Sequence, residues 1–225
     1  MALTVKRELG CAAGVPISAI VVGGRRASLV PLVFEARVWT HGVLVGASMG
    51  SETTAAATGA VGVMRRDPMA MKPFCGYNFA DYFAHWLSFD THGAKLPKIF
   101  HVNWFRKGDD GKFLWPGFGD NIRVLEWMIG RVKGETGAGA TPIGLMPAVE
   151  DICLDGIALD AEAQDKLFGF DVAGWERELE GIREFLEGLG ERCPRALHEQ
   201  CEVISQKLQE VGQSSGPATA GPASA

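Results

Sequence analysis

The segment from Val15 to Val22, VPISAIVV, constrains the fold of this 225-residue chain more than any other. It is short, apolar and rich in β-branched side chains, and it ends in Gly23-Gly24, a pattern typical of a buried strand that runs into a tight turn. A strand that is apolar on both faces needs neighbours in a parallel or mixed sheet. The sequence therefore predicts a mixed α/β fold with this strand inside the sheet.

Further elements follow from periodicity. LVPLVFEARVW (29–39) and KIFHVNWF (98–105) predict strands, and the ring spacing in NFADYFAHWL (78–87) predicts a helix. NIRVLEWMIGRV (121–132) predicts a second helix, entered through Gly117-Phe118-Gly119-Asp120. The segment from Met49 to Val63 is rich in small residues and predicts a surface loop.

The C-terminal part predicts two amphipathic helices, broken at Cys193-Pro194. One apolar stripe runs from Trp175 to Leu189 and the other from Leu197 to Val211. We expect three divisions: a leader at 1–13, one α/β unit at 14–212 with a helical C-terminal end, and a disordered Pro/Ala/Gly/Ser-rich tail at 213–225.

Charge and cysteine usage exclude several protein classes. The formal net charge of −5 argues against a general nucleic-acid binder. No apolar stretch is long enough to span a membrane, and the N-terminal residues do not resemble a secretory signal. The five cysteines contain no CxxC pair, which indicates reduced thiols and a cytoplasmic location, and no metal-ligand spacing occurs.

The aromatic segment HVNWFRKGDDGKFLWPGFGDN (101–121) is the first candidate site. Flat rings on loops can enclose a nucleobase, and the amide of Asn121 can donate to and accept from a base edge. The helix start after Gly119 and Asp120 offers free backbone N–H groups. The alternative is that the rings pack in the core between Gly/Pro turns.

The second candidate is Gly23-Gly24-Arg25-Arg26. Two glycines allow close backbone approach, and two guanidinium groups suit phosphate or carboxylate. The alternative is a pair of solvated arginines after a turn. Arg65-Arg66-Asp67 presents a similar choice between an anchor for the preceding loop and a surface charge pair.

Three segments closely resemble GTP-dependent phosphoenolpyruvate carboxykinase. They are GVPISAIVVGGRRASLVPLVFEARVWTHGVLVGASMGSETTAAA, RRDPMAMKPFCGYNFADYFAHWL and AKLPKIFHVNWFRKGDDGKFLWPGFGDNIRVLEWM. The resemblance covers only the C-terminal third of that family's enzyme. It implies a lyase of gluconeogenesis that converts oxaloacetate and GTP to phosphoenolpyruvate, GDP and carbon dioxide, and a fold that is the C-terminal part of the carboxykinase nucleotide-binding domain.

The resemblance also implies roles for individual residues. Arg25 would contact the phosphoryl group in transfer, and the residues around the guanine would be Phe105, Phe113, Phe118, Gly119, Asp120 and Asn121. Residues 50–63 would form the lid over the site, including Ser51, Glu52, Thr54, Ala55 and Ala56. The lid departs from the family pattern: Thr58, Gly59 and Ala60 replace its acidic residue and lysine, and Gly50 replaces an arginine.

The family's remaining machinery is expected upstream of this segment. GTP is its substrate, and Mn²⁺ and Mg²⁺ are its metals. No Gly-rich-Lys-Ser/Thr phosphate loop occurs in this chain, and the manganese ligands are absent from it, so we expect no metal site. One interpretation is a carboxykinase fragment that binds guanine nucleotide but cannot catalyse alone. The alternatives are a non-catalytic module that docks on a carboxykinase or its missing N-terminal part, and an incomplete gene product.

Overall fold

The computed structural model describes residues 15–53, 62–91 and 93–214. A five-stranded mixed sheet forms its centre, in the order β1-β5-β2-β7-β6. The strands are β1 (Ala19–Gly23), β2 (Val33–Glu35), β5 (Lys98–Val102), β6 (Gly139–Thr141) and β7 (Gly144–Met146). β1 and β5 are parallel, and the other neighbours are antiparallel.

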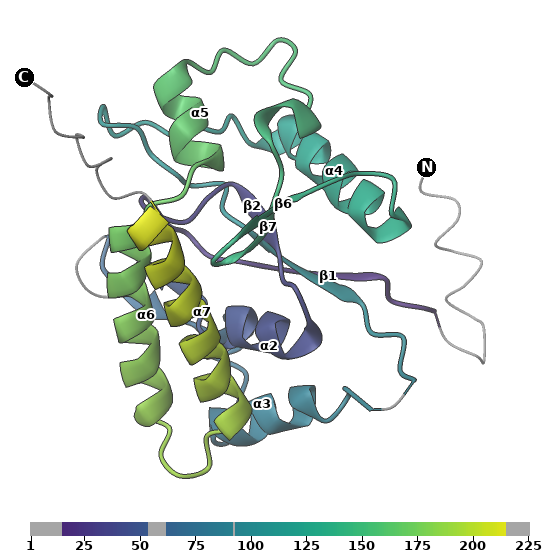
Figure 1. Ribbon diagram of the computed structural model, residues 1–225, viewed down its shortest axis with the longest axis vertical. Helices are drawn as coiled ribbons and strands as arrows, with labels where there is room; N and C mark the ends of the chain where they lie inside the picture. The colour runs from purple at the N-terminus through teal and green to yellow at the C-terminus, as the bar shows by residue number, and fades with distance from the viewer. Residues whose placement is uncertain (1–14, 54–61, 92, 215–225) are drawn as a thin grey trace, which may run out of the picture.

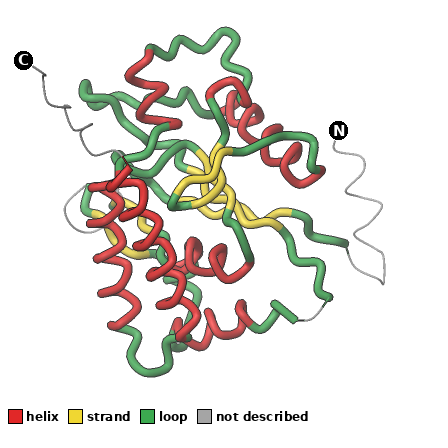
Figure 2. Tube along the Cα trace, in the orientation of Figure 1, coloured by secondary structure: helices red, strands yellow, loops and turns green. Residues whose placement is uncertain are grey.

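Helices cover both faces of the sheet (Figures 1 and 2). On one side lie α4 (Asn121–Lys133) and α5 (Ala161–Phe168). On the other lie α2 (Trp39–Ala47), α3 (Phe79–Leu87), α6 (Val172–Glu187) and α7 (Arg195–Ser214). No described helix is long and apolar enough to cross a membrane.

Strand alternation divides the core into two clusters. Phe34 and Ile99 join the cluster beneath α2, α6 and α7, whereas Val33 and Phe100 join the cluster beneath α4 and α5. Successive side chains of a strand point to opposite faces, so each central strand supplies both clusters. The predicted α/β fold with a helical C-terminal end is confirmed.

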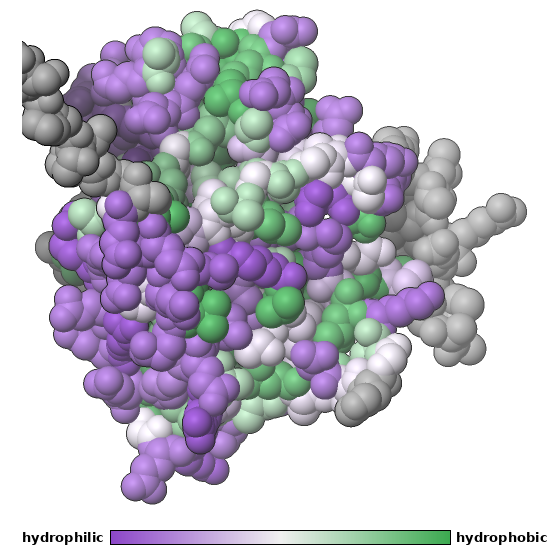
Figure 3. All heavy atoms as spheres, viewed as in Figure 1, coloured by the Kyte–Doolittle hydropathy of each residue, from purple (hydrophilic) through white to green (hydrophobic). Residues whose placement is uncertain are grey.

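The prediction that Val15–Val22 is buried was wrong. The strand covers Ala19–Gly23 and lies at the sheet edge, paired only with β5 among the described strands. Ile17 is 66 % exposed and Val21 is 45 % exposed. The apolar composition identified a sheet strand correctly but could not show whether a second neighbour lies beside it. In Figure 3 hydrophobic atoms reach the surface around α2 and β1, whereas the outward faces of α6 and α7 are hydrophilic.

The strand predicted for residues 29–39 is also shorter than expected. The strand covers Val33–Glu35, and helix α2 begins at Trp39. Nearly every residue of α2 is buried, so it carries no polar stripe that would mark it as a helix. A short apolar run does not distinguish a buried strand from a buried helix.

The predicted loop at 49–63 contains β-structure at its base. β3 (Gly50–Glu52) pairs with β4 (Met64–Arg66) as a separate two-stranded sheet. Residues 54–61, the leader at 1–13 and the tail beyond Ser214 lie outside the described residues. The helices predicted at 78–87 and 121–132, and the break at Cys193-Pro194, are confirmed by α3, α4, α6 and α7.

Candidate functional site

The loop after β1 is held in tight contact with two neighbouring strands. A Cβ atom at Gly24 would lie 2.1 Å from the carbonyl oxygen of Gly50, and one at Gly23 would lie 2.5 Å from that of Val102. A side chain at either position would collide with backbone. The prediction that these glycines allow close approach is therefore confirmed, and the approach places the arginine loop against the base of the segment at 50–63.

Asn103, which the sequence analysis did not single out, fixes this loop to the aromatic segment. Its amide nitrogen donates to the carbonyl oxygens of Arg26 and Val30, each at 2.9 Å. Its amide oxygen accepts from the backbone N–H groups of Arg26 (3.3 Å) and Phe105 (3.1 Å). Asn103 is fully buried, and a polar residue between the large apolar side chains of FHVNWF was the available signal.

The two arginines of the loop have different environments. Arg26 is buried and bonds both carboxylate oxygens of Glu178 on α6, at 3.1 and 2.7 Å. Arg66 of β4 bonds the same carboxylate at 2.6 Å. Burial acts to raise the pKa of Glu178, but hydrogen bonds and charge from Arg26 and Arg66 outweigh it, and the pKa is lowered. Glu178 therefore stays ionised and joins β4 to the arginine loop.

The two arginines of Arg65-Arg66-Asp67 have different roles. Arg66 is an anchor for β4, whereas Arg65 is half-exposed and lies 3.9 Å from Asp67. The anchor interpretation thus holds for Arg66, and the surface-pair interpretation holds for Arg65.

Arg25 faces a polar pocket instead of the interior. Its backbone N–H donates to Ser51 Oγ at 3.2 Å, and its guanidinium carbon lies 4.0 Å from the centre of the Phe105 ring, a cation–π contact. Glu52 closes the loop on the other side, because its carboxylate accepts from the backbone N–H of Ala27 at 2.6 Å. The pocket is lined by Gly23, Gly24, Arg25, Ser51, Glu52, Thr53, Arg65 and Phe105.

A second pocket adjoins the first through a pair of rings. Phe105 and Phe113 meet edge to face, with ring centres 5.8 Å apart. Phe113 is half-exposed and lines the second pocket with Leu114, Pro116, Asp120 and residues 156–158. Arg25, Phe105 and Phe113 thus form a continuous row from the arginine loop to an open slot.

Phe118 stands apart from that row. It is 96 % exposed, has a φ of +50° and makes no ring contact among the described residues. Positive φ is costly for an aromatic residue, and such conformations concentrate at ligand-binding sites. Its neighbour Gly119 is also exposed. Trp115, by contrast, is fully buried, so the core-packing alternative holds for that ring.

The start of α4 is fixed by side chains on both flanks. Asn121 Oδ1 accepts from Trp115 Nε1 at 2.9 Å, which leaves the Asn121 amide NH₂ as the group able to meet a ligand. Asp120 bonds Arg123 at 3.0 Å, and Arg123 also donates to the carbonyl oxygens of Cys153 and Asp155. These contacts tie the wall formed by residues 153–158 to the helix that carries Asn121.

The described residues do not fit a resident metal. They contain no group of three or more His, Cys, Asp or Glu side chains that could hold an ion. The predicted lid residues Thr54, Ala55 and Ala56 lie outside the described residues, so only Ser51 and Glu52 of that set can be placed.

Known proteins with similar sequences place this segment beside carboxykinases. The family model for the phosphoenolpyruvate carboxykinase C-terminal P-loop domain matches residues 3–207. The chain is 51 % identical over 199 residues to the phosphoenolpyruvate carboxykinase [GTP] of Chlamydia pneumoniae. It is 52 % identical over 199 residues to that of Neocallimastix frontalis, and 52 % identical over 196 residues to that of Anaeromyxobacter dehalogenans.

These alignments cover 87–88 % of this chain but 33 % of each relative. The chain therefore spans about one third of the length of the relatives that it matches.

Proposed function

Because this chain belongs to the GTP-dependent phosphoenolpyruvate carboxykinase family, we propose that it provides the guanine-binding part of a carboxykinase active site. Phe105, Phe113 and Phe118 enclose the guanine, and Asn121 meets the base edge. The row from Arg25 through Phe105 to Phe113 carries the proposal. It joins an open slot lined by Phe113 to an arginine that faces a polar pocket.

Arg25 has the charge and rigidity that phosphoryl transfer needs. In the family's reaction the γ-phosphoryl group passes from GTP to the enolate oxygen left by decarboxylation, and GDP departs. Negative charge spreads over the phosphoryl oxygens in this step, and fixed cations stabilise it. The Arg25 backbone is anchored by Ser51, and its guanidinium group rests on Phe105, so it is held in place before a ligand binds.

The remaining chemistry depends on groups that this chain does not supply. Neither a phosphate loop sequence nor, among the described residues, a manganese-binding cluster is present. We therefore assign the complete conversion of oxaloacetate to phosphoenolpyruvate to an assembly that contains the other two thirds of the family's polypeptide.

Titration of GDP and ADP against the folded chain by calorimetry tests the guanine slot. We expect weak binding with a preference for GDP, because the base contacts lie in this chain and most phosphate and metal contacts do not. Trp104 and Trp115 flank the slot in sequence and can report binding by fluorescence. Equal affinities, or no binding to a chain with a cooperative melting transition, would reject the proposal.

A second candidate function is a non-catalytic module that docks on a carboxykinase or on the N-terminal part of the family's polypeptide. The exposed edge of β1 favours it, because Val21 and Ile17 leave apolar surface beside a strand whose outer edge pairs with no other described strand. Co-purification with the N-terminal two thirds of a relative, without gain of carboxykinase activity, would distinguish docking from catalysis.

A further inference from the structure

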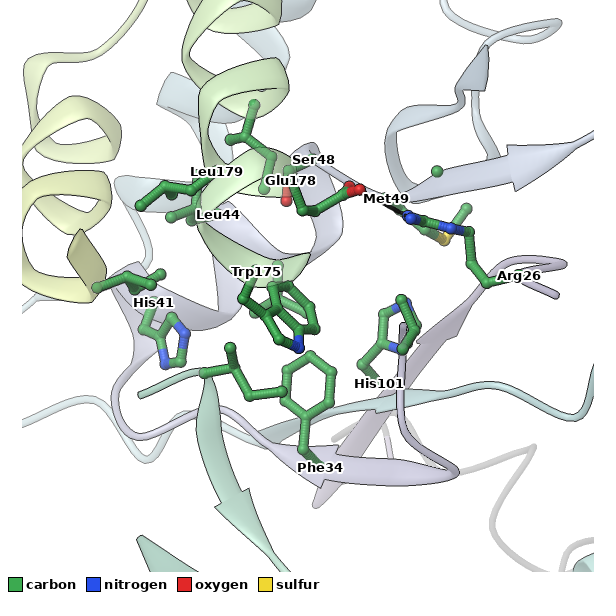
Figure 4. A pocket seen from close by; sticks show the side chains of 16 residues that line it. Arg26, Phe34, His41, Leu44, Ser48, Met49, His101, Trp175, Glu178 and Leu179 are labelled. Carbon is green, nitrogen blue, oxygen red and sulfur yellow. Dashed lines mark hydrogen bonds and ion pairs between the residues drawn. The ribbon is translucent and has the colours of Figure 1, made fainter. Parts of the chain in front are cut away.

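The interior of the molecule contains a pocket behind Arg26, between the sheet and helices α2, α6 and α7 (Figure 4). Its volume is about 50 Å³. Its walls are mostly aliphatic and aromatic, with side chains such as Leu44, Ile143 and Ile182. It is separate from the two open pockets of the candidate site.

Buried polar atoms without partners gather around this pocket. Among the described residues four buried side-chain polar atoms have no hydrogen-bond partner, and three of them belong to residues that line it. They are His41 Nε2, His101 Nδ1 and Trp175 Nε1. They come from three different elements, α2, β5 and α6, and Figure 4 shows their rings around Phe34. Buried polar groups in native proteins are nearly always paired, so this concentration indicates an occupant.

The protonation of these rings limits what the occupant can be. His41 Nδ1 accepts from the backbone N–H of Arg37 at 3.1 Å. Burial, assisted by the charge of Arg37, lowers the pKa of His41 to about 3, so the ring is neutral at pH 7. Its proton therefore resides on Nε2, and Nε2 is a donor. The indole N–H of Trp175 can only donate. His41 Nε2 and Trp175 Nε1 are therefore two donors that require an acceptor.

We propose that this pocket is a hydration site, in which ordered water accepts hydrogen bonds from His41 Nε2 and Trp175 Nε1 and pairs with His101 Nδ1. One water needs roughly 10–15 Å³ of such space, so a pocket of about 50 Å³ has room for roughly three to five. A nonpolar occupant would leave the donors unpaired. Arg26 is the cationic residue in the described lining, and both of its terminal nitrogens already donate to Glu178, so it is not free to bind an anion.

The water joins three elements directly behind the buried ion cluster. Trp175 and Glu178 lie one helical turn apart on α6, so water that ties Trp175 to α2 and β5 also helps to hold Glu178 beneath Arg26. Water is therefore a structural part of the framework behind the arginine loop.

Nuclear Overhauser contacts between water and indole N–H protons test this site in the ¹⁵N-labelled full chain. Rotating-frame spectra separate such contacts from hydrogen exchange. Trp39 and Trp115 are internal controls. Both are at least as buried as Trp175, but Trp39 donates to the carbonyl oxygen of Trp86 and Trp115 donates to Asn121. We expect a contact with long-lived water at Trp175, absent at both controls, and Trp175→Phe identifies the resonance by its loss.

Xenon supplies a second measurement, because a dry apolar cavity binds it and a hydrated polar one does not. We expect no shift of the Leu44 and Ile182 methyl signals under xenon pressure. The proposal is overturned if Trp175 lacks a water contact in a spectrum where Trp39 and Trp115 show their folded resonances. It is equally overturned if xenon shifts those methyl signals.

Discussion

At the scale of single residues, Phe118 and Asn121 are the most informative positions. Phe118→Ala should weaken the binding of GDP and of ADP equally, by roughly 1–3 kcal/mol, because stacking is tolerant of base identity. It should not lower the melting temperature, because the ring is 96 % exposed. Calorimetric titration and thermal melting of the same samples separate the two effects. A lower melting temperature with unchanged affinities would contradict a binding role.

Asn121→Ala should reduce the difference in affinity between GDP and ADP, because we propose that this amide hydrogen-bonds the edge of the base. It also removes the acceptor of Trp115 Nε1, so the chain should lose about 1–3 kcal/mol of stability. Trp115→Phe is the matched control: it breaks the same hydrogen bond but keeps the Asn121 amide. We expect the GDP preference to survive in Trp115→Phe, and its loss there would show that Asn121 acts only through folding.

The buried histidines predict a pH dependence of stability. Burial, together with Arg26, lowers the pKa of His101 to about 3 against the opposing charge of Glu178, and the pKa of His41 is also about 3. In the unfolded chain these histidines titrate near pH 6.5. Between about pH 3 and pH 6.5 the unfolded chain therefore binds more protons than the folded chain. The contribution of the two neutral histidines to the free energy of unfolding is complete above about pH 6.5 and declines as the pH falls toward 3.

The expected slope is up to about 1.4 kcal/mol per pH unit for each histidine. Urea unfolding between pH 7 and 5 measures it. His101→Phe should reduce the slope, whereas His85→Gln, at an exposed position, should leave it unchanged. Identical slopes in all three proteins would show that folding does not lower the pKa of His101.

At the scale of elements, β1 leaves one of its edges without a partner among the described strands. Its outer backbone groups and the exposed side chain of Val21 form a template for pairing with another chain. Val21→Lys should reduce self-association, as measured by light scattering after size exclusion. Val203→Lys is a control of similar exposure on helix α7 and should have no such effect. A wild-type chain that stays monomeric at high concentration would contradict the prediction.

At the scale of the whole molecule, the 225-residue chain should have no carboxykinase activity. Phosphoryl transfer depends on positioning and electrostatics, and a chain that spans 33 % of its relatives lacks the phosphate loop that provides both. The assay is manganese-dependent phosphoenolpyruvate formation from oxaloacetate and GTP, with a full-length relative as the positive control. Product above the blank would refute this assignment.

The sequence by itself determined the family, the α/β class, the C-terminal helix pair and the tight glycine turn before Arg25, because these depend on local pattern and on long motifs. Only the tertiary structure decided that β1 is an edge strand and that residues 39–47 form a buried helix, since an apolar run is compatible with either environment. The tertiary structure also distinguished the buried arginines from the arginine that faces the pocket. Arg26 and Arg66 converge on Glu178, which lies more than a hundred residues beyond either in the chain, whereas Arg25 turns outward to Phe105. Such contacts depend on how the sheet and α6 pack together, and no spacing in the sequence records that.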